Sequence, residues 1–154
     1  MKKLLILVAL MAIMAIGSHA QAATIWTEPF TSAADWSVSG GTGTITSNGT
    51  QGLFDAPNAS SSLTGIYDKT KGPAFDPVNK SNYDWVFKTD GVTGSMSYEI
   101  ALDTFDSSLV YINSVYVQPN DTFVGTKTVN LGGFTFNGST AYISPKVTVY
   151  TGLA

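Results

Sequence analysis

The chain has 154 residues, with eight lysines, eleven acidic residues, one histidine and no cysteine or arginine. This length suits one domain with its own core and is too short for two. The lack of cysteine excludes disulfides and thiol chemistry. An acidic surface without arginine argues against nucleic acid and anionic membranes as partners. The many Thr, Ser, Val, Tyr and Phe residues favour strands over helices.

Residues 1–22 have the pattern of a signal peptide. A basic start and an uninterrupted apolar run at 4–16 precede small residues that permit cleavage after Ala20 or Ala22. The run is too short for a transmembrane helix and has no basic flank. We therefore expect a secreted, extracellular, cell-surface or periplasmic protein of bacterial origin. Its residues 23–154 are expected to form one β-sandwich domain that is not inserted in a membrane after cleavage.

Cleavage would remove the single histidine, His19, and leave six lysines against eleven acidic residues, a formal charge of −5. Without His or Cys, the mature chain cannot build a Ser-His-Asp or Cys-His nucleophile or a zinc site of the usual type. No glycine-rich phosphate-binding motif is present.

Short strand-like runs separated by turn residues follow one another along the mature chain. An Asn-Gly or Asp-Gly pair between two such runs indicates a hairpin, because both turn positions need a positive φ. The strands are expected at 24–29, 35–39, 42–47, 50–54, 85–88, 134–136, 140–143 and 147–150, with turns at Asn48-Gly49, Asp90-Gly91, Asn137-Gly138 and 119–121 and a break at Gly40-Gly41. This pattern, without a convincing helical period, predicts antiparallel sheets packed on one another.

The stretch at 94–118 predicts the central hairpin of the sandwich. Apolar residues at even positions from 96 to 102 alternate with polar ones, which is typical of a strand with one buried and one solvent-facing side. After a turn at 106–108, the run at 109–117 has apolar residues on both faces, as expected of a strand that is covered on both sides. Residues 55–82, with three prolines, are expected to form a long loop.

Aromatic residues beside polar ones are candidate positions for stacking on sugar rings. The first group consists of Tyr83, Trp85 and Phe87 on one face of a strand, with Asn82, Asp84 and Lys88 close by. If this face points outward it forms a stacking platform, and if it points inward it belongs to the core. The second interpretation is the one we prefer. Weaker candidates are Tyr67 with Asp68, Tyr111 with Asn113, and Tyr116 with Gln118, whereas Trp36 is expected to be a core anchor.

Two carboxylates at about 5–5.5 Å or roughly 6.5–9.5 Å would be needed for glycoside hydrolysis. Glu28 and Glu99 are the two glutamates of the chain. Glu99 and Asp103 share a strand face, but four residues place their Cα atoms roughly 13 Å apart. We therefore expect no catalytic residues and no enzymatic activity.

A structural Ca²⁺ is the one cofactor alternative, because hard cations need only carboxylate and carbonyl oxygens. Asp103, Asp106, Asn120 and Asp121 supply such oxygens at turns, although their spacing matches no calcium-binding motif. We expect these residues to form turns, and we expect no metal site and no cofactor.

Residues 28–30, Glu-Pro-Phe, and 35–41, Asp-Trp-Ser-Val-Ser-Gly-Gly, resemble the first strands of bacterial exported jelly-roll domains. These are the carbohydrate-binding-module and concanavalin-A-like sandwiches of surface proteins that carry a PEP-CTERM sorting tail. The resemblance covers only these residues, and the chain lacks the Val-Pro-Glu-Pro of that tail, so it is expected to be released or held by partners. The resemblance implies a jelly-roll β-sandwich, a Trp packed in the core, and glycan binding.

We therefore expect a non-catalytic β-sandwich that binds polysaccharide or another glycan. The alternative is a structural subunit of an extracellular matrix, fibre or surface coat that self-associates through exposed edge strands. A glycan-active enzyme comes third, because two glutamates and no histidine leave few groups for acid–base work. The exposure or burial of Tyr83 and Trp85 distinguishes the first two hypotheses.

Overall fold

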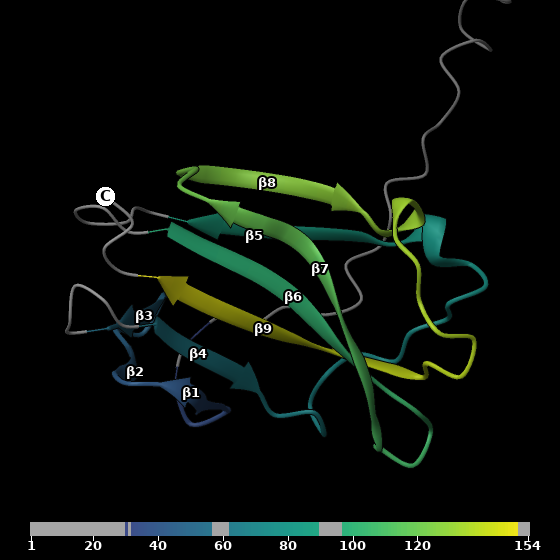
Figure 1. The fold of residues 1–154 in the computed structure, drawn as a ribbon, viewed down its shortest axis with the longest axis horizontal. Helices are drawn as coiled ribbons and strands as arrows, with labels where there is room; N and C mark the ends of the chain where they lie inside the picture. The colour runs from purple at the N-terminus through teal and green to yellow at the C-terminus, as the bar shows by residue number, and fades with distance from the viewer. Residues whose placement is uncertain (1–29, 31, 57–61, 90–96, 151–154) are drawn as a thin grey trace, which may run out of the picture.

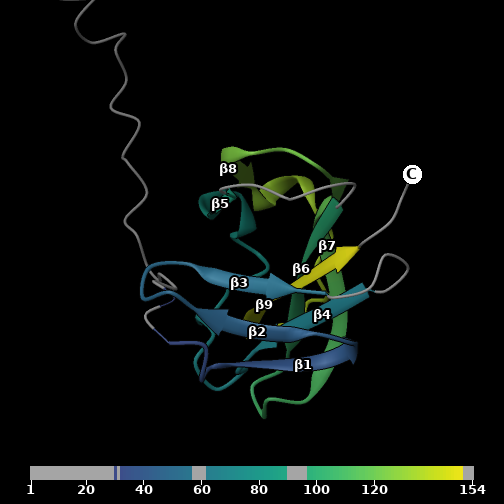
Figure 2. The same cartoon turned by 90° about the vertical axis from the view of Figure 1, so that its left-hand side faces the viewer.

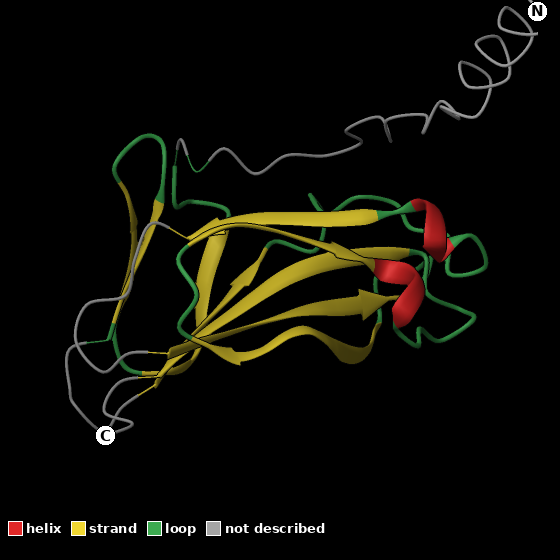
Figure 3. Cartoon of the chain, turned by 90° about the horizontal axis from the view of Figure 1, so that it is seen from above, coloured by secondary structure: helices red, strands yellow, loops and turns green. Residues whose placement is uncertain are grey.

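The computed structural model describes residues 30, 32–56, 62–89 and 97–150 (Figure 1). Within these ranges the chain is all-β, and its strand pairs are antiparallel. The strands are β1 (Trp36–Gly41), β2 (Thr44–Ser47), β3 (Gly52–Asp55), β4 (Ser62–Tyr67), β5 (Asp84–Thr89), β6 (Ser97–Phe105), β7 (Tyr111–Asp121), β8 (Gly125–Asn130) and β9 (Tyr142–Tyr150). Two 3-10 turns, η1 (Lys80–Asn82) and η2 (Leu131–Gly133), lie together at one end (Figure 3). No helical segment in these ranges has the length and apolar character that a bilayer crossing requires.

The strands form two layers. Strands β1, β4, β9, β6 and β7, in that spatial order, make one five-stranded antiparallel sheet, which we call the main sheet. The hairpins β2–β3 and β5–β8 are separate two-stranded sheets. Figure 2 shows β2–β3 beside β1 and β4, and β5–β8 beside β6 and β7. The arrangement is β-sandwich-like, with a second layer that is divided in two.

The hydrophobic core lies between the main sheet and the β5–β8 hairpin. Its buried members are Phe75, Tyr98, Ile100, Leu102, Val115, Val117, Leu131, Phe136, Ile143 and Val149. Trp85, Phe87 and Val129 pack against this group from the hairpin. Full burial of one such apolar side chain stabilises the fold by about 2 kcal/mol. The chain has no disulfide, so this packing is its main source of stability.

A smaller aromatic group joins the β2–β3 hairpin to the main sheet. The Trp36 ring is 8% exposed, and its centroid lies 5.2 Å from that of Phe30, 5.3 Å from Phe54 and 5.4 Å from Tyr67. The prediction that Trp36 is a core anchor is therefore confirmed. Beneath the hairpin, a Cβ atom at Gly65 would stand 2.7 Å from Cε1 of Phe54, so glycine lets the two layers approach.

The central hairpin is confirmed, because β6 and β7 pair antiparallel around a turn at 106–110. The burial of its two strands is the reverse of the prediction, in which the second strand was covered on both sides and the first on only one. Strand β6 is buried on nearly its whole length because β9 and β7 flank it on either side. Strand β7 is the outermost strand of the sheet and exposes Tyr111 and Tyr116. Position within the sheet, rather than the apolar pattern, decides which strand is covered.

Strand β4 lies inside the range that was predicted to be a loop. Leu63 and Tyr67 are buried, and Thr64 and Ile66 between them are half-buried, which is the alternation of an ordinary strand. The missing side chain at Gly65 hides this alternation in the sequence. The long loop is therefore shorter than predicted.

Several predicted boundaries also differ. Gly40-Gly41 belongs to β1, residues 119–121 complete β7, and 134–136 are not a strand. The last two predicted strands are one continuous β9, and β8 was not predicted. Turns are present at Asn48-Gly49 and Asn137-Gly138, with backbone hydrogen bonds of 3.2 and 3.0 Å. The first joins β2 to β3 as predicted, but the second does not form the predicted hairpin, because residues 134–136 are not a strand. The strand at 24–29 and the turn at Asp90-Gly91 lie outside the described residues.

Candidate functional site

Four of the aromatic candidates predicted from the sequence, Tyr67, Tyr83, Trp85 and Phe87, pack toward the interior. Tyr83 and Trp85 are half-buried and pack against the core, as does Phe87. Tyr67 is 7% exposed and packs edge-on against Trp36. Their rings therefore occupy the positions of core residues, and they do not form a solvent-facing platform. By the criterion stated for Tyr83 and Trp85, this burial counts against glycan binding at these rings and favours the structural-subunit alternative.

The polar neighbours of these rings face solvent instead. Asn82 in η1 and Asp84 at the start of β5 are exposed. The Asp84 carboxylate accepts a hydrogen bond of 2.8 Å from Nδ2 of Asn130 on the paired strand β8. The side of β5 that faces away from the core carries Asp84, Lys88 and the exposed Val86, without an aromatic ring.

A different group of side chains gathers on the face of the main sheet that points away from the core. Because side chains alternate along a strand, the inward-facing core residues of β6 leave Glu99, Ala101 and Asp103 on this outer face. Across the sheet, Ala101 pairs with Lys146 of β9 on one side and with Tyr116 of β7 on the other. We call the resulting group the outer-face cluster; it consists of Glu99, Asp103, Tyr111, Ser114, Tyr116, Lys146 and Tyr150.

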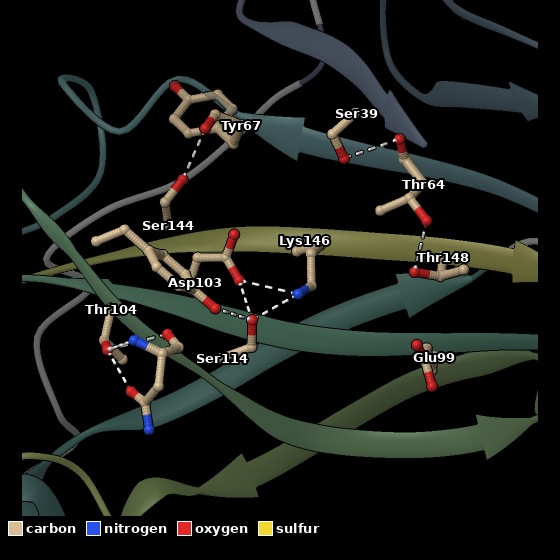
Figure 4. Close-up of polar contacts among 12 residues, drawn as sticks. Ser39, Thr64, Tyr67, Glu99, Asp103, Thr104, Ser114, Ser144, Lys146 and Thr148 are labelled. Atoms are coloured by element: carbon tan, nitrogen blue, oxygen red, sulfur yellow. Dashed lines mark hydrogen bonds and ion pairs between the residues drawn. The ribbon is translucent and has the colours of Figure 1, made fainter. Parts of the chain in front are cut away.

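The hydroxyl of Ser114 is the centre of the cluster (Figure 4). It donates to Oδ1 of Asp103 at 2.6 Å and accepts from Nζ of Lys146 at 2.5 Å, while that ammonium lies 3.1 Å from the same carboxylate oxygen. The side chains of Lys146 and Asp103 are only 17% and 13% exposed. Since the single proton of the Ser114 hydroxyl is engaged, the Tyr111 hydroxyl, 3.0 Å away, is the donor in their contact.

Two tyrosine rings flank this polar centre and remain accessible. Tyr111 is 54% exposed and Tyr116 is 51% exposed. The Lys146 ammonium stands 5.6 Å from the centroid of the Tyr116 ring, which is within the range of a cation–π contact. The ring of Tyr111 packs edge-on against Phe105 at 6.0 Å. Both rings are thus held in place while part of each remains open to a ligand.

Glu99 and Tyr150 extend the cluster along the sheet. The Tyr150 hydroxyl donates to Oε1 of Glu99 at 2.8 Å. Burial, followed by this hydrogen bond and the charge of Glu99, raises the pKa of Tyr150 to about 12. The phenol is therefore neutral at physiological pH and keeps its own proton, which it donates in a hydrogen bond to the Glu99 carboxylate.

The carboxylates that were considered for Ca²⁺ are engaged with protein groups. Asp103 is paired with Lys146. Asp106 accepts from the backbone amides of Ser108 and Val110 at 2.8 and 2.9 Å. Asp121 likewise caps the turn that follows it, through two amides at 2.7 and 3.0 Å. In the part of the chain that the structure describes, no group of three or more His, Asp or Glu residues is arranged to hold a metal ion.

Simple alternation along β7 would not have found the cluster. Tyr111 and Tyr116 are an odd number of residues apart, which places them on opposite faces of a regular strand. A register shift pairs Phe105 with Tyr111 but Thr104 with Asn113, and this irregularity brings both rings to the outer face. The contact with Lys146 depends on the spatial order of the strands, for which the sequence carries no signal.

The arrangement combines partly open aromatic faces with fixed donors and acceptors. Such a combination suits a ligand that offers both apolar C–H surface and hydroxyl groups. The two carboxylates and one ammonium of the cluster leave little net charge, which does not favour a strongly ionic ligand. No protein-family model, curated protein or solved structure matches this chain. The cluster is therefore interpreted from its own geometry.

Proposed function

We propose that this protein is an exported, non-catalytic β-sandwich of jelly-roll type that binds a neutral glycan on its outer-face cluster. One observation carries the proposal: Tyr111 and Tyr116, both about half exposed, flank the hydrogen-bonded centre formed by Asp103, Ser114 and Lys146. The rings offer stacking surface for pyranose faces. The polar centre offers both donors and acceptors for sugar hydroxyls.

The carboxylates of the cluster are better suited to binding than to hydrolysis. Glu99 accepts a hydrogen bond from the Tyr150 hydroxyl, and Asp103 accepts one from Ser114 and forms an ion pair with Lys146. The two acids lie on one strand, four residues apart, with Ala101 between them. A binding role also needs no metal, cofactor or histidine.

A glycan array followed by calorimetry on its hits tests this function. The exported protein should bind at least one neutral polysaccharide. Tyr116→Ala and Tyr111→Ala should each weaken binding about tenfold, as expected for an aromatic anchor at a binding site. Val86→Ala is the matched control, because Val86 is 57% exposed on the opposite layer.

Near-ultraviolet circular dichroism would show that each variant remains folded. Trp85→Ala should lower stability, because this ring packs against the core, and should leave the affinity of the folded fraction unchanged. A folded protein that binds no glycan, or binding that survives both tyrosine substitutions, would overturn the proposal.

The alternative function, a structural subunit, is favoured by one separate observation. Strand β7 forms an outer edge of the main sheet and carries no charged residue before its last position. Such an edge suits strand-to-strand contact between copies of the chain.

A further inference from the structure

Strand β7 differs from the other strands at the edges of the described sheets. It is eleven residues long, and from Tyr111 to Asn120 none of its side chains is ionisable at neutral pH. Proteins usually protect such edges with lysine, with proline, with short strands or with bulges. In β7 proline occurs only at Pro119, and the register shifts against β6 lie on either side of the run from Asn113 to Tyr116, so this middle part of the strand has none of these protections.

The remaining edges carry the usual protection. Strand β1 has six residues, a register shift between Val38 and Gly40, and a φ of 76° at Gly41. Strands β2 and β3 have only four residues each. The β5–β8 hairpin bears Asp84, Lys88 and Lys127. Among the described strands, β7 is therefore the edge best able to accept another strand.

The backbone of β7 has hydrogen-bonding groups directed toward this edge. The amide and the carbonyl of Asn113 contact the Thr104 hydroxyl at 3.3 and 3.0 Å, so both point toward β6. Because these groups alternate in direction along the regular part of the strand, those of Ser114 and Tyr116 point away from β6. From Asn113 to Tyr116 the pairing with β6 shows no register shift, which leaves a regular run for a further strand.

We propose that β7 pairs antiparallel with β7 of a second copy of this chain and joins the two main sheets into one. A strand that pairs with its own copy about a two-fold axis is self-complementary. If one residue of the first copy contacts a given residue of the second, the reverse contact between the two copies also forms. The absence of charge from Tyr111 to Asn120 removes the like-charge repulsion that would oppose this pairing. The exposed Tyr116 then loses part of its contact with water at the junction.

The pairing has a geometric consequence for the outer-face cluster. A two-fold axis perpendicular to the joined sheet leaves the outer faces of both copies on the same side. The dimer thus presents two clusters in one direction, which raises the avidity for any repeating ligand. The pairing itself does not depend on carbohydrate binding, and it is tested without a ligand.

Sedimentation velocity of the exported protein over a wide concentration range tests the pairing. The parent protein should show a concentration-dependent dimer. Tyr116→Lys places two like charges at the junction, and Tyr116→Pro removes an amide directed toward it; each should weaken dimerisation about tenfold or more. Val86→Lys adds the same charge on β5, away from β7, at a side chain with an exposed fraction similar to that of Tyr116. This variant should leave the dimer intact.

Cross-linking provides a second measurement that does not disturb the edge charge. The chain has no cysteine, so a single introduced thiol reports only on its own symmetry mate. Asn113→Cys should give a disulfide-linked dimer under mild oxidation, because its backbone groups point toward β6 and opposed residues at such non-hydrogen-bonded positions bring their Cβ atoms to about 4.5 Å, within reach of a disulfide. Val86→Cys should remain monomeric. A parent protein that stays monomeric at every concentration overturns the proposal, as does a dimer unaffected by both edge variants or equal cross-linking at Val86.

Discussion

The ammonium nitrogen of Lys146 lies 3.1 Å from Oδ1 of Asp103, and both side chains are largely withdrawn from water. Lys146→Met keeps the aliphatic stem and removes the charge, which leaves Asp103 with Ser114 as its remaining described donor. The free energy of unfolding at neutral pH should fall by about 2 kcal/mol, as for other charged hydrogen bonds in partly buried sites.

Urea denaturation of the single and double variants checks this expectation. Asp103→Asn should also destabilise the protein, but the double variant should lose clearly less than the two single losses combined, because neither charge is then left unpaired. Strictly additive losses would show that Lys146 and Asp103 do not interact.

The hydrogen bond from Tyr150 to Glu99 predicts a loss of stability at alkaline pH. Burial, and then the hydrogen bond and charge of Glu99, raise the pKa of Tyr150 from 10.0 to about 12 in the folded chain. The folded state therefore holds this proton more tightly than the unfolded state does. The resulting stabilisation is complete below pH 10 and is lost as the pH rises through 12.

Tyr150→Phe should remove this part of the alkaline decline in the free energy of unfolding. Denaturation at several alkaline pH values measures it, and the ultraviolet absorbance of tyrosinate follows the titration directly. Parent and variant profiles that fall in parallel over this range would contradict the assignment.

The centre of the core predicts a large cavity effect at Leu102, which is 0% exposed. Leu102→Ala should lower the free energy of unfolding by about 3 kcal/mol, since neighbouring strands relax only partly into the space. Val86→Ala, at a site that is 57% exposed, should change it by less than about 0.5 kcal/mol. Thermal and chemical denaturation would compare the stability losses of the two variants. Similar losses would show that Leu102 does not lie in the centre of the core.

Two glycines with positive φ provide a matched pair. Gly41 has a φ of 76°, and a Cβ atom there would overlap the carbonyl oxygen of Ser62 on β4. Gly49 has a φ of 95°, and a Cβ atom there would meet open space. Gly49→Ala should therefore cost only the backbone strain of about 1 kcal/mol, and Gly41→Ala at least about 2 kcal/mol more. Equal destabilisation of the two variants would mean that β1 and β4 do not approach as closely as described.

The sequence was sufficient to predict local features of the fold. The inward direction of Tyr98, Ile100 and Leu102, the turn after Asp106 and the Asn48-Gly49 turn all depend on residues close together in the chain, and all three are present. Strand β4 was missed because Gly65 has no side chain to complete the pattern. Which strand is central and which is at the edge depends on pairing between distant segments, so the burial of β6 and β7 was predicted in reverse.

In the candidate site, too, the features that depend on neighbouring residues could be predicted, and those that depend on pairing between distant strands could not. The sequence drew attention to Tyr111 and Tyr116, but separately, because a regular strand places them on opposite faces. The register shift opposite Phe105 brings them to one side, and local sequence carries no clear sign of it. The pairing of Lys146 with Asp103 joins β9 to β6 across the middle of the main sheet, and no rule of spacing predicts it.

The division of the second layer determines which parts of the protein open first. The described strands of β2–β3 and β5–β8 form separate sheets, so each hairpin can detach without breaking hydrogen bonds of the other. The four-residue strands of β2–β3 should exchange their amide hydrogens and admit proteases well before β6 and β9, which are paired on both sides. The outer-face cluster lies on β6, β7 and β9, toward the opposite edge of the main sheet from β1, beside which the β2–β3 hairpin lies. A cut or transient opening of β2–β3 would therefore leave the tyrosines and their polar centre in place.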